Sequence, residues 1–170
     1  MKTNSIKSIK MLSLDTATRH TGYALFKNGR YEKSGCLSVK REESDPVDKM
    51  LTKISSLLKK YKPNIIVVED TMVPRNAKVQ RDLTEILGAI RFWCVENNSF
   101  YYAIKPTEWR KLVKSPDESI PTERKGLKNW AKQKSQKYTH KYITYDDESD
   151  AILIGQAYIN LFENSIFETI

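Results

Sequence analysis

The 170-residue sequence is poor in the residues that form thiol, zinc and disulfide sites, since it contains two cysteines and two histidines. Cys36 and Cys94 stand alone, without the paired spacing of a zinc site or a redox motif. We expect both to be reduced and to serve as small apolar residues of the core. No G-x-S-x-G motif and no Walker-type glycine loop occurs either. The sequence therefore offers no motif for serine, zinc or nucleoside-triphosphate chemistry.

Long apolar runs are also missing. No segment approaches the roughly 20 consecutive apolar residues that span a bilayer. Residues 1–8 are polar and basic and lack the apolar centre of a signal peptide. We therefore expect a cytoplasmic protein with a flexible, basic N-terminus at residues 1–8. The length fits a single domain over residues 1–170.

Negative charge is scarce relative to positive charge. The chain has 29 lysines and arginines against 21 acidic residues, which gives a net charge of +8. Such an excess raises the long-range attraction for phosphate backbones and anionic membranes. The charge therefore predicts a polyanionic partner.

The apolar pattern predicts an α/β fold. Short apolar or β-branched runs predict strands at residues 9–15, 22–26, 31–39, 65–69 and 100–104. Apolar residues at helical spacing predict helices at residues 47–61, 76–96 and 122–138, and two more that begin near residues 106 and 146. The expected order is three strands in a meander, followed by alternating helices and strands.

Two carboxylates lie at the ends of predicted buried strands. Asp15 ends the first strand and Glu69 ends the fourth. An open α/β sheet binds its ligands outside the carboxyl ends of its strands, so both acids are site candidates. An alternative for Asp15 is a turn-forming role that caps residues 16–18.

Four acidic residues lie within five positions at the start of the last predicted helix. Asp147 and Asp150 are three residues apart and share one helix face. Asp146 and Asp150, four apart, would also share a face, so Asp146 is an alternative ligand. An ordinary acidic N-cap would explain one aspartate better than it explains this whole cluster.

Together these acids form an oxygen-rich ligand set without a His or Cys cluster. Such hard ligands select Mg²⁺ or Mn²⁺. Two such ions about 3.5–4 Å apart can support in-line displacement at a phosphodiester, and the basic chain would bind the nucleic acid. His20 is nearby in the sequence, and we interpret it as a polar loop residue.

Four segments, in this order, resemble the RuvC-type Holliday junction resolvases of the RNase H-like superfamily: LSLDTATRHTGYAL, IIVVED followed by RNA, KPTEWRK, and DDESDAILIG. The resemblance covers about residues 9–160. It implies an RNase H-like nuclease domain with a mixed five-stranded sheet flanked by helices, a homodimer, and Mg²⁺-dependent paired nicking of four-way DNA junctions. Its catalytic and metal-binding acids fall on Asp15, Glu69, Asp147 and Asp150.

The resemblance also implies positions that contact DNA. The family's apolar wedge would fall on Met72 or Val73, and its basic residues near the scissile phosphate match segments around Arg110 and around Arg124 and Lys125. Independently, residues 122–138 form a lysine-rich helix with Leu127 and Trp130 as its few apolar anchors, so we expect Lys125 and Lys128 to contact phosphates. An alternative is an ordinary solvated surface here, with the DNA path near Arg75, Lys78 and Arg110.

Three other functions use similar features. A nuclease of the same fold could act on RNA–DNA hybrids or DNA flaps, because the acids serve any phosphodiester. An actin-like ATPase opens with a similar strand-Asp-Thr-Gly pattern, but such folds need a duplicated domain that 170 residues do not provide. A non-catalytic DNA-binding module would keep the positive charge, although the presence of all four acids argues against it.

Overall fold

The computed structural model describes residues 8–70 and 76–167, and this part of the chain forms five strands and five helices. The strands are β1 (Lys10–Asp15), β2 (His20–Lys27), β3 (Arg30–Ser38), β4 (Ile65–Glu69) and β5 (Phe100–Ile104). The helices are α1 (Pro46–Tyr61), α2 (Ala77–Glu96), α3 (Pro106–Val113), α4 (Arg124–Thr139) and α5 (Asp146–Phe167). Each predicted element is present, and most boundaries agree within two residues.

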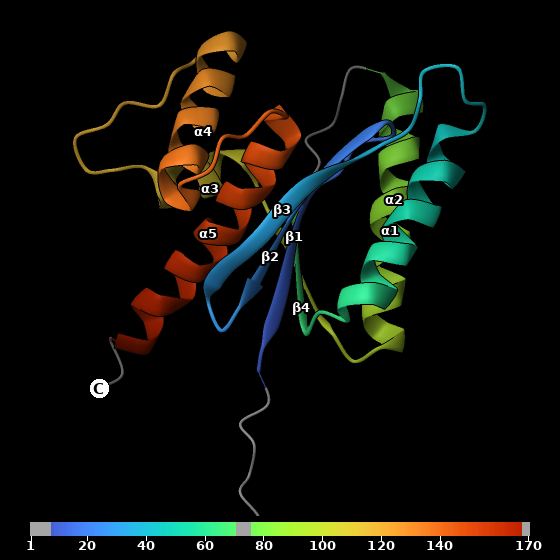
Figure 1. Cartoon of the computed structure of the whole chain (residues 1–170), viewed down its shortest axis with the longest axis horizontal. Helices are drawn as coiled ribbons and strands as arrows, with labels where there is room; N and C mark the ends of the chain where they lie inside the picture. The colour runs from blue at the N-terminus through green and yellow to red at the C-terminus, as the bar shows by residue number, and fades with distance from the viewer. Residues whose placement is uncertain (1–7, 71–75, 168–170) are drawn as a thin grey trace, which may run out of the picture.

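One mixed sheet organises the molecule, with the strand order β3-β2-β1-β4-β5. The first three strands pair antiparallel, and β1, β4 and β5 pair parallel. Helices α1 and α2 cover one face of the sheet, and α3, α4 and α5 lie on the other (Figure 1). The predicted α/β architecture is therefore confirmed.

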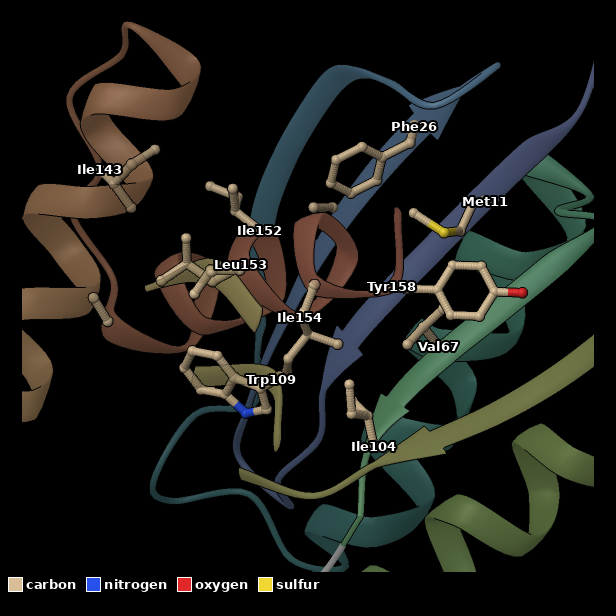
Figure 2. Packing of buried hydrophobic residues seen from close by; sticks show 14 of the residues in the cluster. Met11, Phe26, Val67, Ile104, Trp109, Ile143, Ile152, Leu153, Ile154 and Tyr158 are labelled. Carbon is tan, nitrogen blue, oxygen red and sulfur yellow. The ribbon is translucent and has the colours of Figure 1, made fainter. Parts of the chain in front are cut away.

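Side-chain alternation along the central strands separates two cores. In β1, Met11 belongs to the cluster that contains α5, whereas Leu12 and Leu14 belong to the cluster under α1 and α2. In β4, Val67 likewise packs on the α5 side. Because successive side chains of a strand point to opposite faces, this pattern aims Asp15 and Glu69 toward α5. Figure 2 shows part of the α5-side cluster.

Helix α5 approaches the sheet closely. The hydroxyl of Ser13 in β1 donates a hydrogen bond of 2.6 Å to the backbone carbonyl of Ala151. At Gly155 a Cβ atom would overlap the ring of Phe26, so only glycine fits there without displacing that ring. This close packing fixes the start of α5 over the carboxyl end of β1.

Two sequence expectations need correction. Cys94 is buried in α2, as expected, but Cys36 lies half-buried on β3, because α5 covers that strand only in part. Helix α4 also buries more of its surface than its few apolar residues suggested. Four of its residues are buried: Trp130, Ala131, Ser135 and Thr139. Small and polar side chains thus form much of its contact surface.

No described helix has the length and apolarity needed to cross a membrane.

Candidate active site

The first two acids lie at the carboxyl ends of neighbouring parallel strands. Strands β1 and β4 run in register up to the pair Leu14 and Val68. Asp15 and Glu69 follow directly, and each is half-buried. The strand geometry therefore places two carboxylates side by side on the α5 face, as predicted for ligand-binding residues of an open α/β sheet.

The other two acids come from the first turn of α5, which crosses this sheet edge. Gly22 of β2 pairs with Asp15, and a Cβ atom at Gly22 would overlap the backbone carbonyl of Asp147. Glu148 links the same turn to β3, since its Oε1 accepts a hydrogen bond of 2.6 Å from the Ser34 hydroxyl. The helix start therefore lies directly on β2, beside Asp15.

The electrostatics show that these acids form one group. Burial raises the pKa of Asp15 well above its ordinary value, and the negative charges of Glu69, Asp150 and Asp147 raise it further. Burial, together with Glu69 and Asp147, raises the pKa of Asp150 to about 7. Burial also raises the pKa of Asp147. Mutual repulsion of this kind is relieved by a bound cation.

Glu69 has a specific hydrogen-bond donor. The Trp109 indole Nε1 in α3 donates a hydrogen bond of 2.6 Å to its Oε2. Burial raises the pKa of Glu69, while this bond and the charge of Arg110 lower it. The Arg110 guanidinium lies 4.9 Å from the centre of the Trp109 ring, and its charge also lowers the pKa of Asp15 and Asp150. Arg110 is therefore a cation close to the acidic group.

Asp146 is directed away from this group. Its carboxylate pairs with Lys128 Nζ at 2.6 Å and with Lys132 Nζ at 3.1 Å, both from α4. The hydrogen bond from Lys128 is the main cause of the lowered pKa of Asp146. Of the two candidates at the start of α5, Asp147 thus lies over Gly22 near the other acids, whereas Asp146 links α5 to α4.

The donor set fits a hard divalent cation, because Asp15, Glu69, Asp147 and Asp150 offer carboxylate oxygens with raised proton affinity. Within residues 8–70 and 76–167, however, no three acidic, His or Cys side chains are arranged as a ready-made metal site. The four carboxylates would hold such an ion through their oxygens.

The predicted DNA contacts lie in different environments. Arg124 and Lys125 are exposed on α4, and with Lys128, Asn129 and Asp146 they line a surface hollow. Lys78 is exposed at the start of α2 and pairs with Asp82 at 3.0 Å. Met72, Val73 and Arg75 lie outside the described residues.

Sequence reasoning missed two contributors to the site and assigned a third to a loop. Trp109 lies within the KPTEWRK segment, and no sequence pattern pairs it with Glu69 forty positions away. Gly22 begins the predicted strand at residues 22–26, next to the strand that ends at Asp15, and this position could have identified it as part of the site. His20 begins β2, where its Nδ1 lies 3.2 Å from the Ser38 hydroxyl, and its charge lowers the pKa of Asp147. It therefore lies near the acidic group rather than in a loop.

The sequence comparisons give relatives of one kind. No protein-family model matches the chain. The crossover junction endodeoxyribonuclease RuvC of Brachyspira hyodysenteriae is 28% identical over 165 residues, which cover 94% of this chain and 98% of that relative. The RuvC of Caldicellulosiruptor saccharolyticus is 22% identical over 116 residues, which cover 62% of this chain and 68% of that protein.

The structural comparisons agree with the sequence relatives. Thermus thermophilus RuvC in complex with a Holliday junction substrate matches with a TM-score of 0.71 at 13% identity and covers 92% of this chain and 96% of its own. The fowlpox virus Holliday junction resolvase matches with a TM-score of 0.57 at 17% identity and covers 90% of this chain and 99% of its own. These matches confirm that this chain is similar to the RuvC-type Holliday junction resolvases and has their RNase H-like fold.

Proposed function

We propose that this protein is a Holliday junction resolvase, a metal-dependent endonuclease that introduces paired, symmetric nicks into four-way DNA junctions. The observation that carries this proposal is the convergence of Asp15, Glu69, Asp147 and Asp150 on one sheet edge in a chain whose relatives are RuvC nucleases. The reaction is hydrolysis of a phosphodiester by in-line attack of water. By analogy with its relatives, we assign the protein to the cytoplasm of a bacterial cell or of a phage-infected host.

The physiological metal is proposed to be Mg²⁺, with two ions per active site and Mn²⁺ as a substitute. Asp15, Glu69, Asp147 and Asp150 would hold the ions through their carboxylate oxygens. When bound, such ions lower the pKa of a coordinated water and stabilise the leaving oxygen. Arg110 adds a positive charge beside the acids, where it would offset the charge of the scissile phosphate.

Branched DNA is the proposed substrate, held mainly through its backbone phosphates. The α4 hollow presents Arg124, Lys125 and Lys128 next to the start of α5, so a strand that enters the acidic site would pass this basic surface. Paired nicks require two active sites, and we propose that a homodimer supplies them. Light scattering on the purified protein would test the dimer, because a 19.7 kDa chain would give twice that mass.

The decisive experiment is incubation with a synthetic, immobile four-way junction in the presence of Mg²⁺. We expect nicks at symmetric positions on two opposing strands and no cleavage when Mg²⁺ is chelated. The same reactions should include an RNA–DNA hybrid, a flap and a linear duplex. Equal or faster cleavage of one of these substrates would contradict junction specificity, and binding without cleavage of any substrate would indicate a DNA-binding module.

A further inference from the structure

The hydrogen bond between Trp109 and Glu69 joins the centre of the α3–α5 core to the acidic sheet edge. Trp109 is completely buried, and its ring lies in the cluster with Ile104, Leu153 and Ile154 (Figure 2). Its Nε1 donates to Glu69 Oε2 at 2.6 Å. Because packing on all sides restricts the indole, the position of the N–H donor is set by the core rather than by solvent.

A second tryptophan makes the same kind of bond at a different carboxylate. Trp130 of α4 stacks on Trp109, with ring centres 6.4 Å apart and planes inclined by 25°. Its Nε1 donates at 2.7 Å to Oε1 of Glu118, which lies in the loop after α3. Glu118 also receives a hydrogen bond of 2.7 Å from Lys134. Two adjacent indoles therefore each hold one glutamate, but only Trp109 holds one that faces the acidic group.

The two glutamates differ in how their charge is balanced. Glu118 has a lysine within ion-pair distance. Glu69 faces Asp15 and Asp150, whose negative charges interact with its own, and the nearby charge of Arg110 offsets only part of this repulsion. A carboxylate repelled by its neighbours would rotate away from them unless something fixed it. The indole N–H is a neutral donor that fixes one oxygen without contributing a charge that competes with a bound cation.

The geometry points to Trp109 as a positioning residue for the proposed metal site: its indole N–H fixes Glu69 Oε2 and leaves Oε1 to bind a cation. This inference rests on the proposed function, because it gives Glu69 the role of a metal ligand. The ring face of Trp109 also supports Arg110, but that contact needs only an aromatic ring. The N–H and the ring face can therefore be separated by substitution.

The test compares Trp109→Phe with the matched control Trp130→Phe. Both variants lose an indole N–H that binds a glutamate, and both keep an aromatic ring in the stacked pair. Outer-shell partners of metal ligands typically change metal affinity roughly 10- to 100-fold. By isothermal titration calorimetry of the DNA-free protein with Mg²⁺, we expect a loss in that range for Trp109→Phe and near wild-type affinity for Trp130→Phe. An equal loss in both variants, or in neither, would overturn the proposal.

A second measurement needs neither metal nor DNA. Indole N–H signals of ¹⁵N-tryptophan-labelled protein can be assigned by replacing Trp93, Trp109 and Trp130 in turn. We expect Glu69→Ala to shift the Trp109 signal and leave that of Trp130 in place, and Glu118→Ala to do the reverse. A Trp109 signal that does not respond to Glu69→Ala contradicts the inference. Failure of the wild-type protein to cleave junctions would instead contradict the proposed function, since the affinity comparison is independent of cleavage.

Discussion

The backbone carbonyl of Asp147 lies against Gly22, in the space that any larger side chain at Gly22 would occupy. Gly22 pairs with Asp15 across β1 and β2, so the same glycine is next to one acid of the site in the sheet and beneath another in α5. The first turn of α5 can reach the acidic edge because β2 has no side chain at this point. The position of Asp147 therefore depends on a residue that has no functional group.

Gly22→Ala tests this dependence. The added methyl group must push the start of α5 outward, so we expect a large loss of cleavage and a destabilisation of about 1–3 kcal/mol, as for overpacked sites. Gly88→Ala is the matched control, since a Cβ atom at Gly88 meets nothing within 4 Å. Because Gly88 lies on the exposed side of α2, this change should stabilise the fold by about 1 kcal/mol. Urea unfolding and junction cleavage measure both effects, and full activity of Gly22→Ala would refute the argument.

The adjacent aspartates at the start of α5 should differ sharply. We expect Asp147→Asn to abolish most of the single-turnover activity, because Asp147 lies with the other acids. Asp146→Asn removes the ion pairs with Lys128 and Lys132 and should cost roughly 1 kcal/mol of stability, with a smaller effect on rate. Single-turnover rates at saturating Mg²⁺ compare the two variants. If Asp146→Asn is the inactive one, Asp146 is the ligand and our assignment of Asp147 is wrong.

The strands and helices could be predicted from sequence because their signals are local. Residues 65–68 are β-branched and apolar, and the apolar residues of α1 recur at helical spacing, so the local pattern identifies each element. Asp15 and Glu69 could be singled out for the same reason, since each directly follows such a run. Whether they ligate metal is a separate prediction.

Contacts between distant residues could not be predicted in this way. The Trp109–Glu69 bond depends on how α3 lies against the end of β4, and the Lys128–Asp146 pair depends on how α4 lies beside α5. Neither contact leaves a pattern in the spacing of residues. The sequence therefore singled out the acids that lie together at this sheet edge. It did not predict that Trp109 contacts Glu69 or that Lys128 pairs with Asp146.

Removal of single carboxylates should separate cleavage from binding. We expect Asp15→Asn, Glu69→Gln and Asp150→Asn each to abolish Mg²⁺-dependent cleavage and to leave junction binding equal or tighter, because a negative charge near the phosphates is lost. Asp70→Asn is the control: Asp70 follows Glu69, but its charge acts on Tyr101 on the other face of the sheet. Gel-shift and cleavage assays on one junction measure both properties. Near wild-type cleavage by Asp15→Asn would refute the assigned site.

The basic surface of α4 makes a prediction about salt. Lys125 is exposed beside the hollow, so Lys125→Ala should weaken binding to all junction sequences alike. The slope of log K against log salt should fall by about 0.9 for each duplex phosphate that the variant no longer neutralises. Lys128→Ala should do the same and, because it also unpairs Asp146, lower stability slightly. Lys59→Ala, in the last turn of α1 on the other side of the sheet, should leave the slope unchanged.

The raised pKa of Asp150 predicts how the stability of the metal-free protein depends on pH. In the unfolded chain this carboxyl loses its proton near pH 4, whereas in the folded protein its pKa is about 7. Between these values the folded state binds more protons than the unfolded state, so the free energy of unfolding falls as pH rises. The stability that the protonated Asp150 carboxyl contributes is fully present below about pH 4. It is lost once the pH has passed about 7.

Asp150→Asn should remove this loss, because the amide resembles the neutral carboxyl. A pKa shift of one unit corresponds to about 1.4 kcal/mol, and with partial exposure and coupled acids we expect a gain of about 1–2 kcal/mol at pH 8. For a chain of this size that is roughly 2–8 °C in Tm. At pH 4 the variant and the wild type should melt together, and Asp117→Asn, in an exposed loop, should match the wild type throughout.

Mg²⁺ should raise the Tm of the wild type at pH 8 far more than that of Asp150→Asn, because cation binding relieves the repulsion that the substitution has already reduced. A wild-type Tm that rises relative to that of Asp150→Asn between pH 4 and pH 8 would contradict the raised pKa.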